Sequence, residues 1–164
     1  LEDKKGNVTG EEITKAKEKI NNVTDTDKKT ALEGRLDQVK EAKKAKEKED
    51  KAQGEAQKAL DKLTGDGITD ENIKKAQEEI NKVTDPDKKQ ELQEKLNQII
   101  AEKAVKELED KKGNVTGEEI TKAEEKINNV TDTGKKTELE GRLNDVKQAK
   151  ENLDKLNEAK TEAE

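Results

Sequence analysis

The sequence predicts an all-α protein, built as an elongated tandem array of small three-helix bundles. The first observation is one short phrase written three times, as VTDTDKK at 23–29, VTDPDKK at 83–89 and VTDTGKK at 130–136. The second is that apolar residues recur at helical spacing on both sides of each phrase. The third is that charged residues make up 46% of the 164 residues, with both signs finely mixed, as on solvent-facing helices.

Long identical stretches establish the repeat. Residues 1–43 and 108–150 agree at 37 of 43 positions, and a more diverged copy lies at 68–99. A unit of this size cannot bury its apolar face alone, so neighbouring units are expected to pack on one another. We predict repeat 1 at 1–50, repeat 2 at 51–100, repeat 3 at 101–147, and a helical extension toward an absent next repeat at 148–164. Repeat 1 is expected to lack most of its first helix.

Each copy begins with a signal for the start of a helix. Two Thr-Gly-Glu-Glu stretches form capping boxes, in which the threonine accepts from a backbone amide and the second glutamate reaches back. Each repeated phrase is the turn before a second helix, where an aspartate caps and Pro86 takes the first helical position. The predicted caps and turns are Thr9, Glu12, Asp25, Thr69, Asp85, Pro86, Thr116, Glu119 and Asp132.

The apolar stripes give a short helix, a tight turn and a long helix in every copy. The short helices are expected to cover about 13 residues, or roughly 20 Å. The long helix of copy two is expected to run from Pro86 to about Lys111, that of copy one as far as Leu63 with Gly54 as a weak point, and that of copy three to the C-terminus. The predicted core stripe is Ile13, Ile20, Leu32, Leu36, Ile73, Ile80, Leu92, Leu96, Ile120, Ile127, Leu139 and Leu143.

A short helix with one apolar stripe needs the long helices before and after it as partners. Each long helix would then be shared by two neighbouring bundles, as in spectrin-like arrays. One bundle is predicted from 52–64, 70–82 and 86–100, and the next from 98–112, 117–129 and 133–147. The helix without a partner at one end matches the gap at the other. We therefore expect weak head-to-tail self-association, besides the contacts between neighbouring repeats of one chain.

Composition argues against several classes of function. The chain contains no cysteine and no histidine, which removes disulfides, thiolate metal sites and the usual general base. It also has no aromatic residue to build a dry pocket, so we expect no enzyme and assign no catalytic, cofactor-binding or metal-binding residue. A net charge of −6 argues against nucleic acid. No run of eighteen apolar residues is present, so no membrane insertion is expected.

Several short motifs have simpler explanations than function. The acidic stretch around Asp66 and Asp70 lacks the spacing of a calcium loop, and four Asn-Val-Thr sequences lie at predicted turns, where these residues are favoured anyway. Arg35 and Arg142 are the only arginines, and they hold matching repeat positions. Arginine is enriched in binding hot spots, so the face around these two is the first to test once a partner is found, although the sequence itself marks no binding face.

The motif resembles the helical repeats of Gram-positive bacterial surface proteins, and is similar to helical repeats in the C-terminal part of some Bacillus insecticidal endotoxins. The resemblance implies an extracellular location at the bacterial cell wall. It also implies a stalk between a wall anchor and a distal head, and for some similar bundles the binding of host serum or matrix proteins. In copy one it is carried by Thr9, Ile13, Ala16, Ile20, Val23, Asp25, Leu32 and Leu36.

The predicted function is that of a structural spacer, or stalk, in a bacterial cell-surface protein, which projects a distal functional domain. One alternative is a host-protein binding module of an adhesin, with albumin, immunoglobulin or a matrix protein as partner. A second alternative is a disordered hydration protectant, because leucine, isoleucine and valine together make up only 29 residues. Three matching helix caps argue against disorder, because a disordered chain has no helix ends for them to stabilise.

Overall fold

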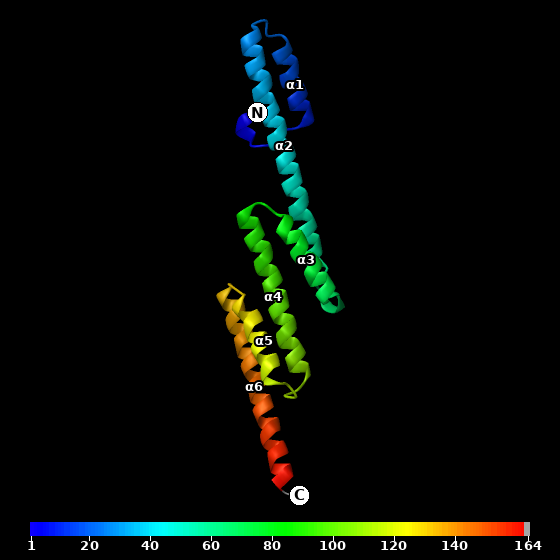
Figure 1. Ribbon diagram of the computed structural model, residues 1–164, viewed down its shortest axis with the longest axis vertical. Helices are drawn as coiled ribbons and strands as arrows, with labels where there is room; N and C mark the ends of the chain where they lie inside the picture. The colour runs from blue at the N-terminus through cyan, green and yellow to red at the C-terminus, as the bar shows by residue number, and fades with distance from the viewer. Residues whose placement is uncertain (163–164) are drawn as a thin grey trace. The chain divides into compact units, whose positions relative to one another are not determined.

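The computed structural model describes residues 1–162, and within that range it contains helices and turns but no strand. The prediction of an all-α protein is therefore confirmed (Figure 1). The elements in chain order are η1 (Glu2–Lys4), α1 (Gly10–Asn21), α2 (Thr26–Asp61), η2 (Gly65–Gly67), α3 (Asp70–Lys82), α4 (Pro86–Asp110), α5 (Gly117–Asn128) and α6 (Thr133–Glu162).

The long helices end close to their predicted ends. Helix α4 runs from Pro86 to Asp110, and α2 passes through Gly54 to Asp61 without a break. A glycine inside a helix costs about 1 kcal/mol relative to alanine, which good helix formers on both sides can offset. The chain divides into two compact units, unit 1 covering Leu1–Gly54 and unit 2 beginning at Glu55. Predicted repeat 3 and residues 55–100 of predicted repeat 2 thus lie in unit 2, whereas residues 51–54 belong to unit 1.

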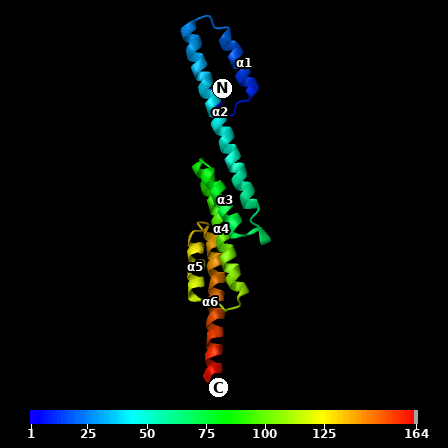
Figure 2. The same ribbon diagram turned by 45° about the vertical axis from the view of Figure 1, so that its right-hand side comes forward.

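Helix α4 is the centre of unit 2. It contacts α3, α5 and α6, and α5 also contacts α6 (Figures 1 and 2). The second half of α4 supplies Ala101, Val105 and Leu108 to one continuous core with α5 and α6. The first half buries Leu92 and Leu96 completely. One helix therefore serves two packing groups, one with α3 and one with α5 and α6.

The end of α2 completes the packing around α3. Ala56, Leu60 and Leu63 near this end are all buried. Residues from the end of α2 and from α3 line one shallow surface hollow, among them Lys58 on α2 and Lys75 on α3. Ala76, Ile80 and Val83 of α3 and its following turn are almost inaccessible to solvent.

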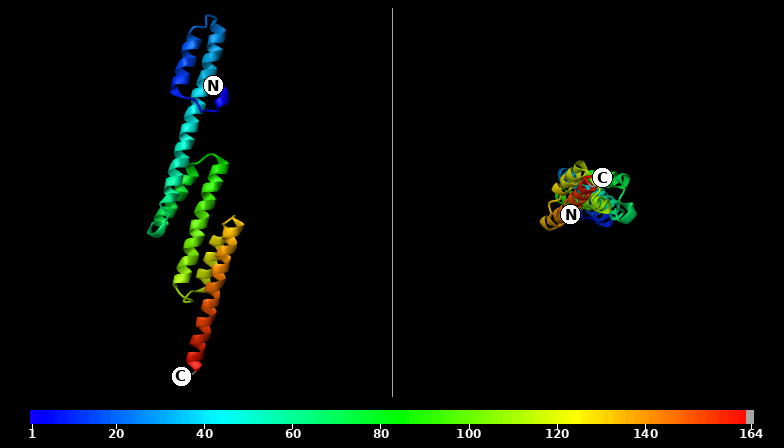
Figure 3. Two further views of the ribbon diagram at one scale, coloured as in Figure 1. Left: turned by 180° about the vertical axis from the view of Figure 1, so that it is seen from behind. Right: turned by 90° about the horizontal axis from the view of Figure 1, so that it is seen from below.

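Unit 1 contains α1, the first part of α2 and the short helix η1 (Figure 3). Its buried apolar side chains are fewer than those of unit 2, and Leu1 remains 39% exposed. Ile13 and Leu32 are half-buried, whereas their counterparts Ile120 and Leu139 in unit 2 are buried. The buried apolar residues of unit 1 are Val8, Ile20, Leu36 and Val39.

The turns that precede α1 and α5 require glycine. Gly113 has a φ of +87°, and a Cβ atom there would lie 2.6 Å from the carbonyl oxygen of Ala149. Gly6 repeats this geometry, with φ of +88° and a Cβ position 2.6 Å from the carbonyl oxygen of Ala42. The repeated Lys-Lys-Gly-Asn stretch therefore sets the turn closely against the long helix that follows.

Local hydrogen bonds define where the short helices begin. The Thr9 and Thr116 side chains accept from the backbone amides of Glu12 and Glu119, and both glutamates accept in return from the threonine amides. Thr69 caps α3 by accepting from Asn72, without the reciprocal bond. These bonds satisfy amides that the first turn of a helix leaves unpaired.

Replacing Thr116 with alanine is expected to lower the free energy of unfolding by about 1 kcal/mol, because the Glu119 amide loses its acceptor. Hydrogen exchange should accelerate first at the start of α5. Thr116→Ser, which retains the hydroxyl, is the control and should behave like the wild type. Equal effects of both substitutions would contradict a capping role.

Candidate functional site

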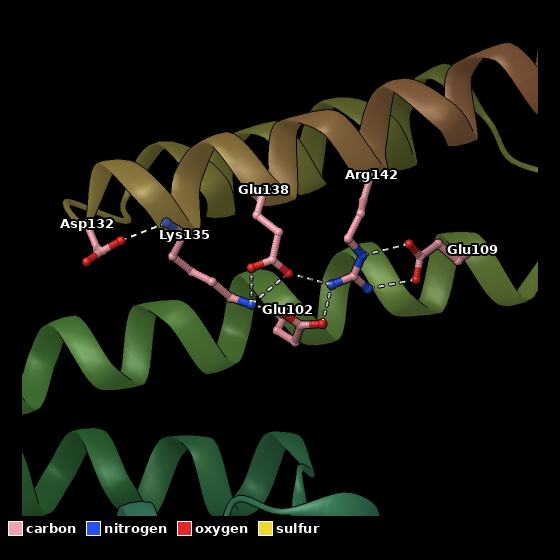
Figure 4. Close-up of polar contacts among 6 residues, drawn as sticks. All are labelled: Glu102, Glu109, Asp132, Lys135, Glu138 and Arg142. Atoms are coloured by element: carbon pink, nitrogen blue, oxygen red, sulfur yellow. Dashed lines mark hydrogen bonds and ion pairs between the residues drawn. The ribbon is translucent and has the colours of Figure 1, made fainter.

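The most extensive polar arrangement of unit 2 joins α4 to α6. Arg142 on α6 donates from Nε and Nη2 to the two carboxylate oxygens of Glu109 on α4, at 2.8 and 2.7 Å. Its Nη1 atom donates to Glu102, which lies two helical turns before Glu109 on α4 (Figure 4). A guanidinium that binds a carboxylate through two parallel bonds fixes both distance and orientation.

Lysine and glutamate of α6 extend this arrangement. The Nζ atom of Lys135 lies 2.7 Å from Oε2 of Glu102 and 3.0 Å from Oε1 of Glu138. That Glu102 oxygen is buried and forms this ion pair without a hydrogen bond of normal geometry. We call these residues the Arg142 network: Glu102, Glu109, Lys135, Glu138 and Arg142.

Helical spacing explains why these side chains meet. Lys135, Glu138 and Arg142 are separated by three and four residues, so they project from one face of α6. Glu102 and Glu109 are seven residues apart, which puts both on one face of α4. Figure 4 shows the two faces opposed, with the α6 side chains extending toward α4. The backbone amide of Lys135 also donates to Asp132, the predicted cap of α6, at 2.6 Å.

The pKa shifts of the carboxyl groups in the Arg142 network do not favour acid–base catalysis at neutral pH. Hydrogen bonds from Arg142 lower the pKa of Glu109 despite partial burial. Partial burial raises the pKa of Glu102, but Arg142 and Lys135 outweigh it and the net shift is downward. A general acid at neutral pH needs a pKa near 7. These carboxylates instead remain ionised and hold two helices together.

A second polar contact holds the turn between α5 and α6 onto α4. Glu94 accepts from the backbone amides of Thr131 and Asp132 at 3.0 Å each, and from the Thr131 hydroxyl at 2.6 Å. Asn97, one turn later on α4, donates to the backbone carbonyl of Asn129 at 2.9 Å. Desolvation of Glu94 raises its pKa, but bonds from Thr131, Asp132 and Gln98 together lower the pKa to about 2. The third copy of the repeated phrase therefore has an acceptor on the preceding long helix, α4.

The lowered pKa of Glu94 predicts a loss of stability in acid. Because the folded-state pKa lies below the unfolded value of about 4.3, the unfolded chain binds more protons, and stability falls as the pH drops from about 4.5 toward 2. Glu94→Gln should lower the free energy of unfolding by about 1 to 2 kcal/mol at pH 7 and should flatten this acid dependence. Circular dichroism melts at pH 7 and pH 3 measure both effects. An unchanged slope in the variant would contradict the assignment.

Copy one repeats part of this chemistry. Arg35 of unit 1 donates to the two oxygens of Glu2 at 2.8 and 2.6 Å, which matches the bond pattern of Arg142 with Glu109. The pairs Lys4–Glu12 and Lys111–Glu119 also correspond. The side chain of Arg35 is 60% exposed, however, against 27% for Arg142. The most complete form of the contact lies in unit 2.

The sequence-predicted caps and turns lie at helix starts in the structure. Asp25, Asp85 and Asp132 accept from the amides of Lys28, Lys88 and Lys135, and Pro86 is the first residue of α4. Nine of the twelve predicted core residues are buried, and the half-buried ones are Ile13, Leu32 and Ile73.

The glutamates that α4 contributes to these two polar contacts were not predicted from the sequence. Glu94, Glu102 and Glu109 belong to no capping box and to none of the predicted apolar stripes. A signal exists in a second, weaker repeat on the long helices, Glu-x3-Gln-x2-Ala-x3-Leu/Val-x2-Leu, which begins at Glu49 and at Glu94. The bonds from Gln53 to Glu49 and from Gln98 to Glu94 are both 3.0 Å.

Unit 2 also carries a groove between α3 and α5, with α4 as its floor. Its volume is about 880 Å³. Ile73, Ile100 and Ala104 provide apolar surface, and charged residues including Lys74 and Lys126 surround it. Over residues 1–162, no group of acidic side chains is arranged to hold a metal ion. None of the helices in that range is long and apolar enough to cross a membrane.

Comparison with known proteins does not place the chain in a family. No protein-family model, no curated protein and no solved structure matches it.

Proposed function

We propose that this chain is a structural spacer, a stalk module of tandem helical bundles in a bacterial cell-surface protein. The observation that carries the proposal is that α4 contacts α3 as well as α5 and α6, so one helix takes part in two successive packing groups. A helix shared in this way couples successive repeats, because it cannot bend or rotate in one group without disturbing the other.

The polar contacts support the same role. Arg142 and Glu94 both act between elements rather than within one helix. They connect the α5–α6 pair to α4, the long helix before it. Near-identical repeats would then add length in equal steps. The bacterial surface location rests on the resemblance of the repeat motif to surface-protein repeats.

Small-angle X-ray scattering tests the spacer function. A spacer requires a radius of gyration well above the roughly 15 Å expected of a compact domain of this length, yet below the roughly 43 Å of an unfolded chain. A circular dichroism spectrum on the same sample distinguishes an extended helical protein from a disordered one. A cooperative helical melt would reject the hydration protectant. A helical protein with a radius near 15 Å would reject the spacer.

A host-protein binding module of an adhesin is the second candidate, and the groove of unit 2 favours it. Apolar grooves flanked by helices accept an amphipathic helix of a partner. A pull-down from human serum and matrix extract on the immobilised chain, read by mass spectrometry, tests this function. The matched control carries Ile100→Glu in the groove. A saturable partner that the control fails to capture would establish the binding class, and a clean negative would leave the spacer.

A further inference from the structure

We propose that the groove of unit 2 binds a small anionic amphiphile, a carboxylate head group on an unbranched apolar chain. This inference does not depend on the spacer function, and it names a different occupant of the groove from the partner helix of the adhesin candidate. The residues that line the groove lie on α3, α4 and α5 or directly after α4, and the structure describes all three helices over their full lengths.

The packing of the three helices leaves an apolar strip of α4 open. Helices α3 and α5 both pack on α4 but scarcely contact each other. Ile100 and Ala104 of α4, with Ile73 of α3, therefore remain half-buried in the groove. Ile100, Ala104 and Leu108 follow one another at intervals of four residues, so they share one face of α4. Helix α4 rises about 12 Å from the first to the last of them, which suits an extended apolar chain.

The size of the groove fits a small molecule. Its volume of about 880 Å³ lies within the range of roughly 300 to 1,000 Å³ found for small-molecule sites. Such sites are mostly apolar and contain a few polar groups that orient the ligand. The polar groups of this groove therefore indicate which head group it takes.

Two of the five lysines in the lining have no partner in the described part of the chain. The other three form the ion pairs Lys103–Asp70, Lys111–Glu119 and Lys122–Glu118. Lys74 on α3 and Lys126 on α5 form neither an ion pair nor a hydrogen bond within residues 1–162. Each offers a charged amine that no carboxylate of the chain neutralises.

The register of α3 on α4 places Lys74 beside the apolar strip. Lys103 of α4 donates to Asp70 at the start of α3 at 2.7 Å, and α3 runs antiparallel to α4. Lys74 follows Asp70 by one helical turn. It therefore lies level with the turn of α4 that precedes Lys103, which contains Ile100.

The register of α5 on α4 brings Lys126 to the same level. Asn97 of α4 donates to the backbone carbonyl of Asn129, just after α5, and α5 also runs antiparallel to α4. Lys126 precedes Asn129 by three residues, so it lies level with the turn of α4 that follows Asn97. That turn also contains Ile100. A carboxylate above Ile100 would thus be attracted by one amine from each wall of the groove.

Acidic side chains keep such a head group away from the ends of the groove. Glu78 and Asp110 also belong to the lining, and within the described residues neither forms an ion pair. Glu78 lies one turn beyond Lys74 on α3, and Asp110 is the last residue of α4. Both repel a carboxylate, which leaves the level of Ile100 as the favourable place for it.

Isothermal titration calorimetry of the full chain with decanoate, kept below its micelle concentration, tests the proposal. Saturable binding with a Kd of about 1 mM or below is expected for a ligand of this size. The control ligand is decyltrimethylammonium, which has the same chain but a cationic head, and it should bind at least about tenfold more weakly. High salt should weaken the binding of decanoate, because Lys74 and Lys126 are exposed to solvent.

Charge reversal in the protein separates this site from any other. The double variant Lys74→Glu with Lys126→Glu should weaken decanoate at least about tenfold and strengthen decyltrimethylammonium, an exchange that non-specific adhesion cannot produce. Both positions lie outside the apolar core, and a circular dichroism melt checks that the fold is retained. The matched control is Lys17→Glu with Lys19→Glu on α1, which changes the net charge equally and should leave the Kd unchanged.

Ile100→Glu, which places a carboxylate in the apolar strip, should abolish the binding of decanoate. No saturable binding, equal binding of the two ligands, or a Kd that the double variant does not change would overturn the proposal. Capture of a serum protein that Ile100→Glu prevents, without binding of decanoate, would also overturn it and assign the groove to a partner helix. Scattering from the free chain does not involve this groove, so the spacer function and this proposal can fail separately.

Discussion

Replacing Leu139 with alanine is expected to lower the free energy of unfolding of unit 2 by about 3 kcal/mol, within the usual range for leucine in a closed core. Leu139 is 0% exposed and lies in the core shared by α4, α5 and α6. The cost combines the lost transfer free energy of the side chain with the cavity that close-packed neighbours cannot fill. Three helices enclose this position, so the surroundings can relax only slightly.

The repeat supplies the control for this experiment. Leu32 holds the same place in unit 1 but is half-buried, so Leu32→Ala should cost about 1 kcal/mol. The chain has no aromatic residue, so unfolding is best followed by circular dichroism and by hydrogen exchange read on separate peptides of the two units. Equal costs at the two positions would show that Leu32 is as closely packed as Leu139.

Short-range features of this fold could be read directly from the sequence. The Thr9 and Thr116 capping boxes and the proline at the start of α4 follow from residues within one helical turn. Local hydrogen bonds of this kind depend little on what packs above them. The continuation of α2 through Gly54 was harder to predict. Helix propensity alone makes a continuous helix and a helix broken at this glycine similar in free energy.

The polar contacts between helices were not predicted from the sequence. Glu102 looks like any other glutamate on a charged helix, and nothing local distinguishes it from Glu107. Its role depends on which residues of α6 lie opposite, and that depends on how two helices are placed in register. Ile13 and Ile120 lie in identical local stripes, yet only Ile120 is buried, in the core that α5 shares with α4 and α6.

The candidate site is therefore a property of pairs of repeats. Arg35 and Arg142 are the same residue in the same local sequence, yet one binds a single glutamate and the other bridges two. What differs is the set of carboxylates within reach, because Arg142 meets Glu102 and Glu109 of α4 whereas Arg35 meets Glu2. Contacts between neighbouring repeats, such as those of Arg142, are what the proposed spacer needs.

Replacing Arg142 with methionine is expected to cost about 2 kcal/mol, less than the loss of a fully buried ion-pair partner because the site is part-exposed. Methionine keeps most of the length of the side chain but removes the charge. The carboxylates of Glu102 and Glu109, on one face of α4, then lose the cation that they share. The loss of the guanidinium should raise the pKa of both carboxyls, since its hydrogen bonds hold those values down. The free energy of unfolding of the variant should therefore depend less steeply on pH between about pH 4.5 and 3 than that of the wild type.

Arg35→Met is the matched control, and it should leave the stability of unit 1 close to that of the wild type, because exposed ion pairs contribute little. Chemical unfolding at low salt and at 1 M NaCl separates charge from packing. Screening should shrink the effect of Arg142→Met only in part, because the guanidinium is 27% exposed and its partners are 35% exposed. If Arg142→Met were harmless while Leu139→Ala was costly, the apolar core alone would join α4 to α6. The Arg142 network would then have no part in coupling one repeat to the next.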